Sequence, residues 1–347
     1  MPELSDPIRI ASLRIRNRAA MAPMVRNLAT EEGKVTKEVI DHYRLRAMGG
    51  VGLIIVEAAA IDWNHRIMNH NIGIYDDTMI QGLSELAAEI KAQGSRVFIQ
   101  INHSGPKGHG KQTYVGPSSI PVMKNNVPVS LTSEDIQNIK YMFVDAARRA
   151  KEAGFDGVEI HGAHYYLLSA FLSSYTNQRR DEYGGSAVNR ARFSVEVIKA
   201  IREELGIYPL IFRMNGLENV VDGVTLEEGI EIAKIIEGAG IDALHISCVV
   251  DETYNPGLSP RFDRDTQPDF LRGYPYDSCI PIAGKIKQHV KIPVIGVGMV
   301  RDAQTARDVM KKGQCDILAL GRALLADPEF VNKTLQGKDN DIILWKD

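Results

Sequence analysis

The chain repeats one short pattern, in which a glycine is followed within a few residues by an apolar run. The pattern occurs in "GGVGLIIVEA", "AGFDGVEIHG", "AGIDALHISC" and "KGQCDILALG", which begin at Gly49, Ala153, Ala239 and Lys312. Glycine ends a helix readily because it adopts the left-handed conformation without a Cβ penalty. Continuous apolar strands are typical of a parallel sheet that is buried on both faces. The sequence therefore predicts helices that alternate with buried parallel strands.

Eight such strands can be placed along the 347 residues. They are expected near residues 19–21, 53–56, 97–101, 157–160, 210–213, 243–246, 294–297 and 317–320. Eight strands alternating with helices indicate an α/β fold with a single (β/α)8 TIM barrel over residues 1–347. The alternating start "IRIASLRIRNR" predicts a short N-terminal hairpin under the barrel. A doubly wound sheet is the competing architecture, but no GxGxxG motif follows the first strand.

Amphipathic helices are predicted between the strands. In the segment "TSEDIQNIKYMFVDAARRAKEAG", which begins at Thr132, Ser133 is expected to be the N-cap residue of the helix. Thr225 and Glu228 form a capping-box pattern at the start of a later helix.

Composition excludes several classes of protein. The net charge of -3 offers no electrostatic footprint for nucleic acid or an anionic membrane. The N-terminus has no signal-peptide core and no segment is long enough to span a bilayer, so a cytoplasmic location is expected. The three cysteines, Cys248, Cys279 and Cys315, lie far apart and form no CxxC motif. Neither a disulfide framework nor a cysteine metal site is therefore expected.

In a TIM barrel the chemistry lies at the carboxyl ends of the strands. The last two predicted strands end in "GVGMV" and "ALGRAL", which place Gly298 and Gly321 in tight turns. Their backbone N–H groups could bind a phosphate, with added charge from Arg322 and from a helix that starts at Ala323. The alternative is that these glycines serve only the turns.

Gln100 and Arg213 lie on the third and fifth predicted strands. An amide that donates and accepts suits a pyrimidine edge, and an arginine stabilises negative charge on the same ring. Reduced flavin mononucleotide needs this combination together with one phosphate site. Each residue could instead be satisfied inside the barrel, Gln100 as a lining amide and Arg213 in an ion pair.

Four ring side chains follow the fourth predicted strand in "VEIHGAHYYLLSAF": His161, His164, Tyr165 and Tyr166. The histidines could bind zinc, relay a proton or pack structurally. Zinc is disfavoured because structural sites need four ligands and no third ligand of fitting spacing is evident; no metal is expected. Position at a helix start would favour neutral imidazoles that donate N–H groups. The residues alone leave a functional pair and a packed pair both open, and Tyr166 could be a core tyrosine.

Longer segments resemble the old yellow enzyme family, in the branch of 2,4-dienoyl-CoA reductases and enoate reductases. They include "MAPM", "FIQINHSG", "HGAHYYLLSAFLSSYTNQRRDEYGGS", "FRMNG", "VIGVGMV" and "ALGRALLADPEF", in family order along nearly the whole chain. The resemblance implies a barrel that binds FMN and uses NAD(P)H as reductant. The implied FMN contacts are Ala22, Pro23, Met24, Val25, Ala58, Gln100, Arg213, Gly298, Met299, Gly321 and Arg322.

The resemblance also gives the histidines and tyrosines roles. His161 and His164 would bind the carbonyl oxygen of an α,β-unsaturated substrate, and Tyr166 would protonate its α-carbon after hydride transfer from flavin N5. Tyr165 stands where the family usually has glycine and is expected to form a wall of the substrate site. Val25 replaces a cysteine or threonine that in some members hydrogen-bonds the flavin.

The implied function is FMN-dependent reduction of the C=C bond of enones or enoyl thioesters. Alternatives are a dehydrogenase or demethylase that runs the same flavin oxidatively, and a flavoprotein subunit that passes electrons to a partner. Larger relatives continue into a 4Fe–4S segment and a dinucleotide-binding domain, neither of which is expected here. A homo-oligomer and a separate electron-donor protein are both compatible with the sequence. Two loops, one carrying Lys107, His109 and Lys111 and the other over residues 247–278, are expected to shape the substrate site.

Overall fold

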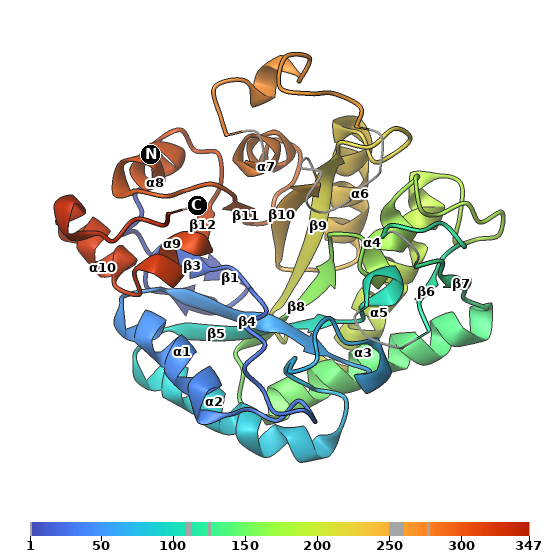
Figure 1. Cartoon of the computed structure of the whole chain (residues 1–347), viewed down its shortest axis with the longest axis horizontal. Helices are drawn as coiled ribbons and strands as arrows, with labels where there is room; N and C mark the ends of the chain where they lie inside the picture. Colours follow the sequence, from blue (N-terminus) through green and yellow to red (C-terminus); the bar gives the residue numbers. More distant parts are fainter. Residues whose placement is uncertain (1, 109–112, 124–125, 250–259, 276–277, 347) are drawn as a thin grey trace.

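The computed structural model describes residues 2–108, 113–123, 126–249, 260–275 and 278–346. Eight parallel strands close into a barrel, and a ring of helices surrounds it (Figure 1). The strands follow one another around the barrel in chain order. They are β3 (Ala19–Met21), β4 (Leu53–Ala60), β5 (Arg96–Asn102), β8 (Gly157–Gly162), β9 (Leu210–Glu218), β10 (Ala243–Val249), β11 (Val294–Val297) and β12 (Ile317–Leu320). The predicted TIM barrel is confirmed.

Seven helices form the outer ring and shorter ones lie at the strand ends. The ring consists of α1 (Lys37–Met48), α2 (Ile80–Ala92), α3 (Ser133–Glu152), α5 (Ala187–Leu205), α6 (Leu226–Gly238), α7 (Ile280–Lys287) and α8 (Ala303–Lys311). The shorter helices are α4 (Leu167–Leu172), α9 (Arg322–Ala326) and α10 (Phe330–Leu335). Single 3-10 turns occupy Trp63–His65, Asp77–Met79, Gly105–Lys107, Asp269–Leu271 and Asp339–Asp341. A two-stranded parallel sheet joins β6 (Val115–Gly116) to β7 (Val129–Ser130).

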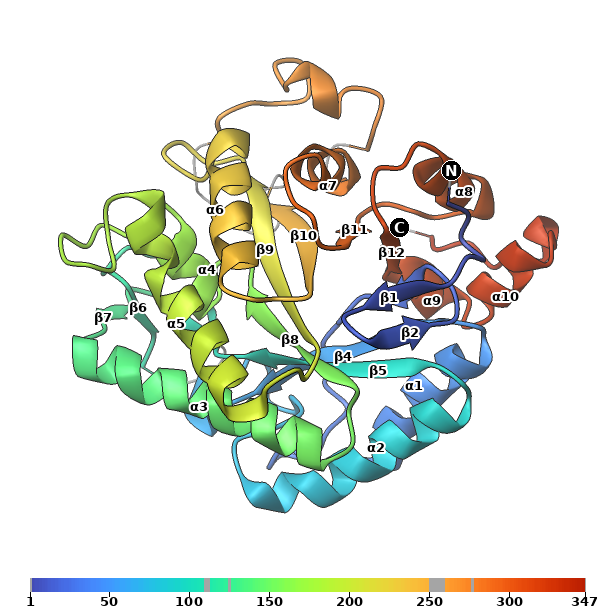
Figure 2. The same ribbon diagram turned by 180° about the vertical axis from the view of Figure 1, so that it is seen from behind.

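A hairpin closes the amino-terminal end of the barrel, as predicted. Strands β1 (Ile8–Ile10) and β2 (Leu13–Ile15) pair antiparallel. Figure 2, which views the molecule from behind, shows this hairpin on the near side of the barrel. Ile10 and Ile15 are fully buried and belong to one apolar cluster with Phe98 and Ile211 of the barrel interior. Because this end is filled with apolar side chains, the opposite, carboxyl end is the one available for binding.

Three strands run further than their apolar patterns predict. β4, β9 and β10 continue through Glu57, Asn215 and Ser247, all of which are buried. The prediction ended each strand at its first polar residue, because a buried strand was expected to be a continuous apolar run. A strand that leads into a binding site can instead continue with polar side chains. The extra length carries these polar groups to the barrel mouth.

Helix caps account for the starts of two outer helices. The N-cap of α3 is Thr132, and the prediction of Ser133 was one residue too late. The Thr132 hydroxyl accepts from the Asp135 backbone N–H, and the Asp135 carboxylate accepts in return from the Thr132 N–H. At α6 the predicted capping box of Thr225 and Glu228 is confirmed.

No helix in the described part of the chain combines the length and apolar composition needed to cross a membrane.

Glu57 on β4 makes folding stability depend on pH. Burial raises the pKa of its carboxyl from 4.5 to about 7, although the Arg26 backbone N–H donates to Oε2 at 2.9 Å. The folded protein therefore holds a proton that the unfolded chain releases near pH 4.5, so this group destabilises the fold increasingly as pH rises from about 4.5 to about 7. Relative to Glu57→Gln, the wild type should lose on the order of 3 kcal/mol of unfolding free energy across this window. Urea unfolding of both proteins at about pH 5 and about pH 8 measures the difference; an equal change in both would contradict it.

Candidate active site

One cavity of ≈710 Å³ opens at the carboxyl ends of the barrel strands. It is lined by all fourteen residues that the sequence assigns to FMN or catalysis: Ala22, Pro23, Met24, Val25, Ala58, Gln100, His161, His164, Tyr166, Arg213, Gly298, Met299, Gly321 and Arg322. The structure therefore brings the predicted site residues to one place from seven strand ends. Further lining residues were not predicted, among them Ser247, Cys248, Cys279 and Arg301.

At one end of the cavity, the turns after β11 and β12 suit an anion. Gly298 and Met299 both have left-handed backbones, with φ of 126° and 55°, which exposes backbone N–H groups in the turn. Arg322 and Arg301 add two guanidinium groups to the lining. Helix α9 starts at Arg322, one residue before the predicted start, and has only five residues. Its dipole is therefore a small contribution, and a phosphate bound here would be held mainly by the turns and the two arginines.

Gln100 lies where the edge of a flavin ring would be recognised, and a buried network fixes its orientation. Its Nε2 donates to Glu159 Oε1 at 2.7 Å, and His245 Nδ1 lies 2.7 Å from Glu159 Oε2. Burial lowers the pKa of His245, so the neutral ring donates its Nδ1–H to the carboxylate. A carboxylate can only accept, which forces the Gln100 amino group toward Glu159 and turns its carbonyl oxygen the other way. Gln100 therefore offers the cavity chiefly an acceptor.

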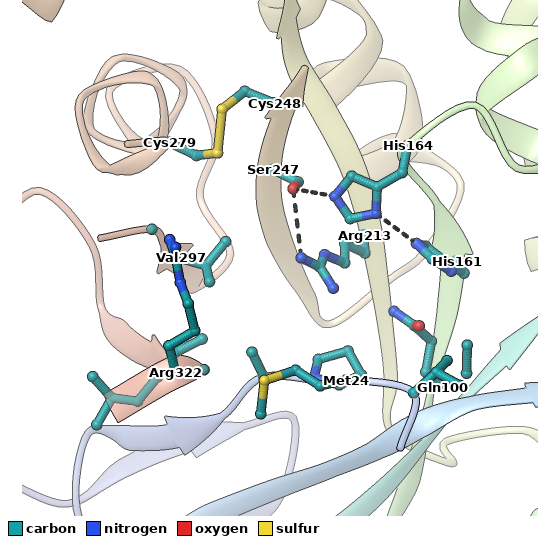
Figure 3. Close-up of a pocket in the computed structure, with 18 of the residues that line it drawn as sticks. Met24, Gln100, His161, His164, Arg213, Ser247, Cys248, Cys279, Val297 and Arg322 are labelled. Carbon is teal, nitrogen blue, oxygen red and sulfur yellow. Dashed lines mark hydrogen bonds between the residues drawn. A yellow bond between two sulfur atoms is a disulfide. The ribbon is translucent and has the colours of Figure 1, made fainter. Parts of the chain in front are cut away.

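The two histidines belong to a hydrogen-bonded chain that crosses the cavity wall (Figure 3). His161 Nε2 lies 3.2 Å from His164 Nδ1, and His164 Nε2 lies 2.6 Å from Ser247 Oγ. Arg213 Nη2 donates to the same Ser247 oxygen at 3.5 Å. Arginine can only donate, so Ser247 Oγ accepts from Arg213, and among the described residues His164 Nε2 is the acceptor within reach of the Ser247 proton. The chain thereby places the His164 proton on Nδ1, the nitrogen that faces His161.

The two imidazoles are neutral, as predicted, but the cause is different. Burial and then the Arg213 guanidinium hold the pKa of both rings well below 6.5, whereas the prediction invoked a helix start. The next helix, α4, begins only at Leu167 and has six residues. With the His164 proton on Nδ1, His161 Nε2 is the acceptor of the 3.2 Å contact between the rings, and the buried His161 Nδ1 has no hydrogen-bond partner among the described residues.

A strained turn carries the histidine into the cavity. His164 and Tyr165 have φ of 62° and 60°, a left-handed conformation that is unusual for bulky residues and concentrates at functional sites. Two side chains hold the turn: Asn215 Oδ1 accepts from the His164 N–H at 3.1 Å, and Ser169 Oγ accepts from the Tyr165 N–H at 3.0 Å.

The two tyrosines point to different surroundings. Tyr166 lines the cavity with its ring centroid 4.8 Å from that of His161, and Lys107 Nζ lies 5.6 Å from the Tyr166 ring. Tyr165 is fully buried in a small cluster with Val122 and Val249. The prediction of Tyr165 as a wall of the substrate site is therefore wrong, because the left-handed turn rotates successive side chains apart.

The loops predicted to shape the substrate site are described only in part. Burial lowers the pKa of Lys107 to about 8, so this residue is a weaker base than a surface lysine. His109, Lys111 and residues 250–259 lie outside the described residues.

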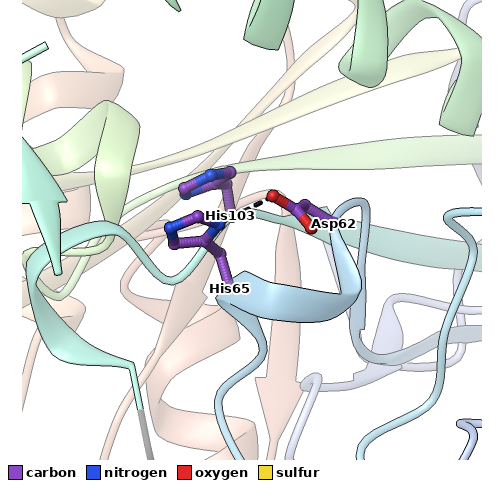
Figure 4. Close-up of side chains that lie close together, drawn as sticks. All are labelled: Asp62, His65 and His103. Atoms are coloured by element: carbon purple, nitrogen blue, oxygen red, sulfur yellow. Dashed lines mark hydrogen bonds and ion pairs between the residues drawn. The ribbon is translucent and has the colours of Figure 1, made fainter. Parts of the chain in front are cut away.

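A second histidine group lies outside the cavity lining. Asp62, His65 and His103 bring one ligand atom each within 4.8 Å of one another (Figure 4). However, His65 Nδ1 is paired with Asp62 at 2.7 Å, and His103 Nδ1 accepts from the Gly105 N–H. The two rings stack at 4.4 Å and 22°, so their lone pairs run side by side and do not converge on one ion. We interpret this group as a structural contact between β4 and β5.

A barrel mouth with an anion grip, an oriented ring-edge amide and a wall of neutral histidines defines a flavin-dependent oxidoreductase. Residues 3–341 match the model of the NADH:flavin oxidoreductase / NADH oxidase family, and the chain belongs to this family. The chain is of the old yellow enzyme type, a family whose flavin is FMN.

Individual relatives agree with this assignment. The chain is 41% identical to an NADH oxidase of Thermoanaerobacter brockii, covering 98% of this chain and 52% of the relative. It is 37% identical to an NADPH dehydrogenase of Geobacillus sp. (strain WCH70), covering 94% and 91%. A solved 2-naphthoyl-CoA reductase complex with 2-naphthoyl-CoA superposes with a TM-score of 0.88 at 30% identity, covering 99% and 53%. The chain thus spans about half the length of the first and third of these proteins.

Proposed function

We propose that this enzyme reduces the C=C bond of α,β-unsaturated carbonyl compounds at the expense of NAD(P)H. The observation that carries the proposal is the chain from Arg213 through Ser247 to His164 and His161, which ends in neutral N–H groups at the cavity. Bound FMN would supply the hydride. Support for a conjugated carbonyl substrate comes also from the similar 2-naphthoyl-CoA reductase, whose bound thioester has its carbonyl beside an aromatic ring.

The histidines would bind and polarise the substrate carbonyl. In the structure the His164 Nδ1–H donates to His161 Nε2. A bound carbonyl oxygen would take a donor from each ring by replacing this bond, with the His161 proton then on Nε2, because His161 Nδ1 has no described partner that holds it. The hydrogen bonds from two N–H donors strengthen as negative charge develops on the carbonyl oxygen. They therefore stabilise the transition state more than they stabilise the bound substrate. Because the low imidazole pKa values keep both rings neutral, this donation should not depend on pH near neutrality.

Tyr166 would deliver the proton to the α-carbon. Its ring lies beside His161 on the same cavity wall, which would place its hydroxyl near a substrate bound through its carbonyl oxygen. The nearby Lys107 ammonium would favour proton release by stabilising the phenolate that forms.

The proposal is tested by mixing the enzyme anaerobically with NADH or NADPH and then with a panel of enones and enoyl thioesters. We expect NADH or NADPH to bleach the flavin absorbance and an enone to restore it. Bleaching by an amine or a saturated ketone without NAD(P)H would instead indicate oxidative use of the flavin. Bleaching by NAD(P)H with no recovery by any enone would indicate an electron-transfer subunit.

Removing the guanidinium of Arg322 should weaken FMN binding. The flavin released from wild type should be FMN, and Arg322→Ala should lose about 1–3 kcal/mol of FMN binding free energy, the scale of losing a charged partner. Fluorescence titration of the apoenzyme with FMN measures the loss. Arg9→Ala, on the exposed face of the hairpin at the other end of the barrel, is the matched control. Equal FMN affinity in both variants would remove Arg322 from the phosphate site.

A further inference from the structure

The wall of the flavin cavity contains a disulfide, which corrects the prediction that the cysteines are unpaired. Cys248 near the end of β10 is joined to Cys279, although 31 residues separate them in sequence. The carboxyl end of β10 and the start of α7 are neighbours around the barrel, so residues distant in sequence meet there. Cys315 is buried and free.

The disulfide lies between the two functional ends of the cavity. Cys248 follows Ser247, which belongs to the histidine chain, and Figure 3 shows the sulfur bridge on the same side of the cavity as Ser247. On the other side, Cys279 supports the phosphate turn, since a Cβ at Gly298 would come within 2.8 Å of the Cys279 nitrogen. The bridge therefore belongs to the cavity wall between the predicted phosphate turn and the histidines.

Both cysteines of the bridge are nearly buried and line the flavin cavity. Cys248 and Cys279 are 5% and 6% exposed, and both belong to the cavity lining. Thiol–disulfide reactions depend on access to the sulfur, so bulk thiols are disfavoured as reductants and a reductant bound in the cavity is favoured. The enzyme's own flavin, reduced by NAD(P)H, is such a reductant.

The ends of the bridge differ in a way that suits reduction. Cys279 is the N-cap residue of α7, where the positive end of the helix dipole favours a thiolate. Cys248 is at a strand end and has no such helix terminus. Cleavage of the S–S bond is therefore favoured in the direction that leaves negative charge on Cys279.

We infer that Cys248 and Cys279 form a redox-active pair that takes two electrons from the reduced flavin, an inference that rests on the proposed NAD(P)H-dependent flavin function. In this step the anionic reduced flavin loses two electrons and one proton and becomes oxidised flavin. The S–S bond breaks, Cys248 takes the proton as a thiol, and Cys279 takes the negative charge as a thiolate. A second NAD(P)H then reduces the flavin again, so the chain holds four electrons when fully reduced.

Thiol counting tests the inference without relying on turnover. The holoenzyme is incubated anaerobically with NADPH, denatured in an alkylating reagent and analysed by mass spectrometry. One alkylated cysteine, Cys315, is expected before reduction and all three afterwards. Apoenzyme treated with the same NADPH should still show one alkylated cysteine. Anaerobic dithionite titration should require two equivalents for wild type and one for Cys248→Ser/Cys279→Ser, and the single Cys248→Ser variant serves if the double variant does not fold.

The outcomes separate this inference from the proposed function. Bleached flavin with one alkylated cysteine would overturn the inference and leave enone reduction intact. Three alkylated cysteines in the oxidised enzyme as isolated would also overturn it. A flavin-dependent rise from one to three alkylated cysteines in an enzyme that reduces no enone would support the pair and reject the proposed substrate class.

Discussion

Replacing Tyr166 by phenylalanine is expected to slow reoxidation of the reduced flavin by an enone about 10²–10⁴-fold, the usual cost of losing a positioned general acid. Flavin reduction by NAD(P)H should be nearly unchanged, because hydride transfer to the flavin needs no protein acid. The variant keeps the ring that lies 4.8 Å from His161 and loses only the hydroxyl, so the cavity shape is preserved. Single-turnover mixing of reduced enzyme with cyclohexenone measures the second half-reaction alone.

Tyr165→Phe is the matched control, since it removes the same atom one residue away. Tyr165 is buried behind the cavity wall with Val122 and Val249, and burial and the Glu218 carboxyl raise the pKa of its hydroxyl well above 10. A group held so firmly in its protonated form is a poor acid, so this variant should reoxidise at close to the wild-type rate. A slow Tyr165→Phe protein with a normal Tyr166→Phe protein would reverse the assignment of the acid.

Lys107 is the other described proton donor near Tyr166. Its pKa is lowered to about 8, so its acidic form is lost as pH rises through that value. If Lys107 supplied the proton, reoxidation of the Tyr166→Phe enzyme would remain fast at about pH 7 and fall above about pH 8. Slow reoxidation at both pH values would leave Tyr166 as the acid.

The fold could be predicted because its determinants are local in the sequence. The glycine that ends each helix and the apolar run that follows identify the eight barrel strands, and strand order in a TIM barrel follows chain order. The cavity-lining residues were predictable for the same reason, because chemistry in this fold gathers at the carboxyl strand ends. The predicted boundaries were poorest at β4 and β9, which continue past their first polar residue.

The remaining features depend on contacts across the barrel, which no local pattern contains. Glu159 orients Gln100 from the next strand, and Ser247 fixes the His164 proton from 83 residues away. The Cys248–Cys279 bridge has no spacing signature because a long loop separates the end of β10 from the start of α7, so the two cysteines are 31 residues apart. A signal was nevertheless present, since Ser247 and Cys248 follow a predicted strand at the end of the barrel where binding occurs.

The histidine pair should bind a phenolate, which mimics the negative oxygen that develops during enone reduction. A phenol added to oxidised enzyme is expected to give a long-wavelength charge-transfer band, its oxygen held by His161 and His164. His164→Ala should abolish the band while FMN stays bound, because a lost hydrogen bond to a charged group costs about 1.5–3 kcal/mol. This loss corresponds to more than tenfold in phenol affinity, measured by absorbance titration. His289→Ala, an exposed histidine after α7, should bind phenol like wild type.

Ser247→Ala tests whether the proton on His164 Nδ1 is held in place by the hydroxyl. Without the Ser247 proton donor, His164 Nε2 loses its 2.6 Å partner, and both tautomers of the ring become accessible. Only the Nδ1–H tautomer donates toward the site, so phenol affinity should fall by a smaller factor than in His164→Ala, with the band retained. Nitrogen NMR of the imidazoles should show His164 as one tautomer in wild type and as a mixture in the variant. Phenol affinity within about twofold of wild type in both variants, well under the tenfold that corresponds to 1.4 kcal/mol, would mean that the oxygen is bound elsewhere.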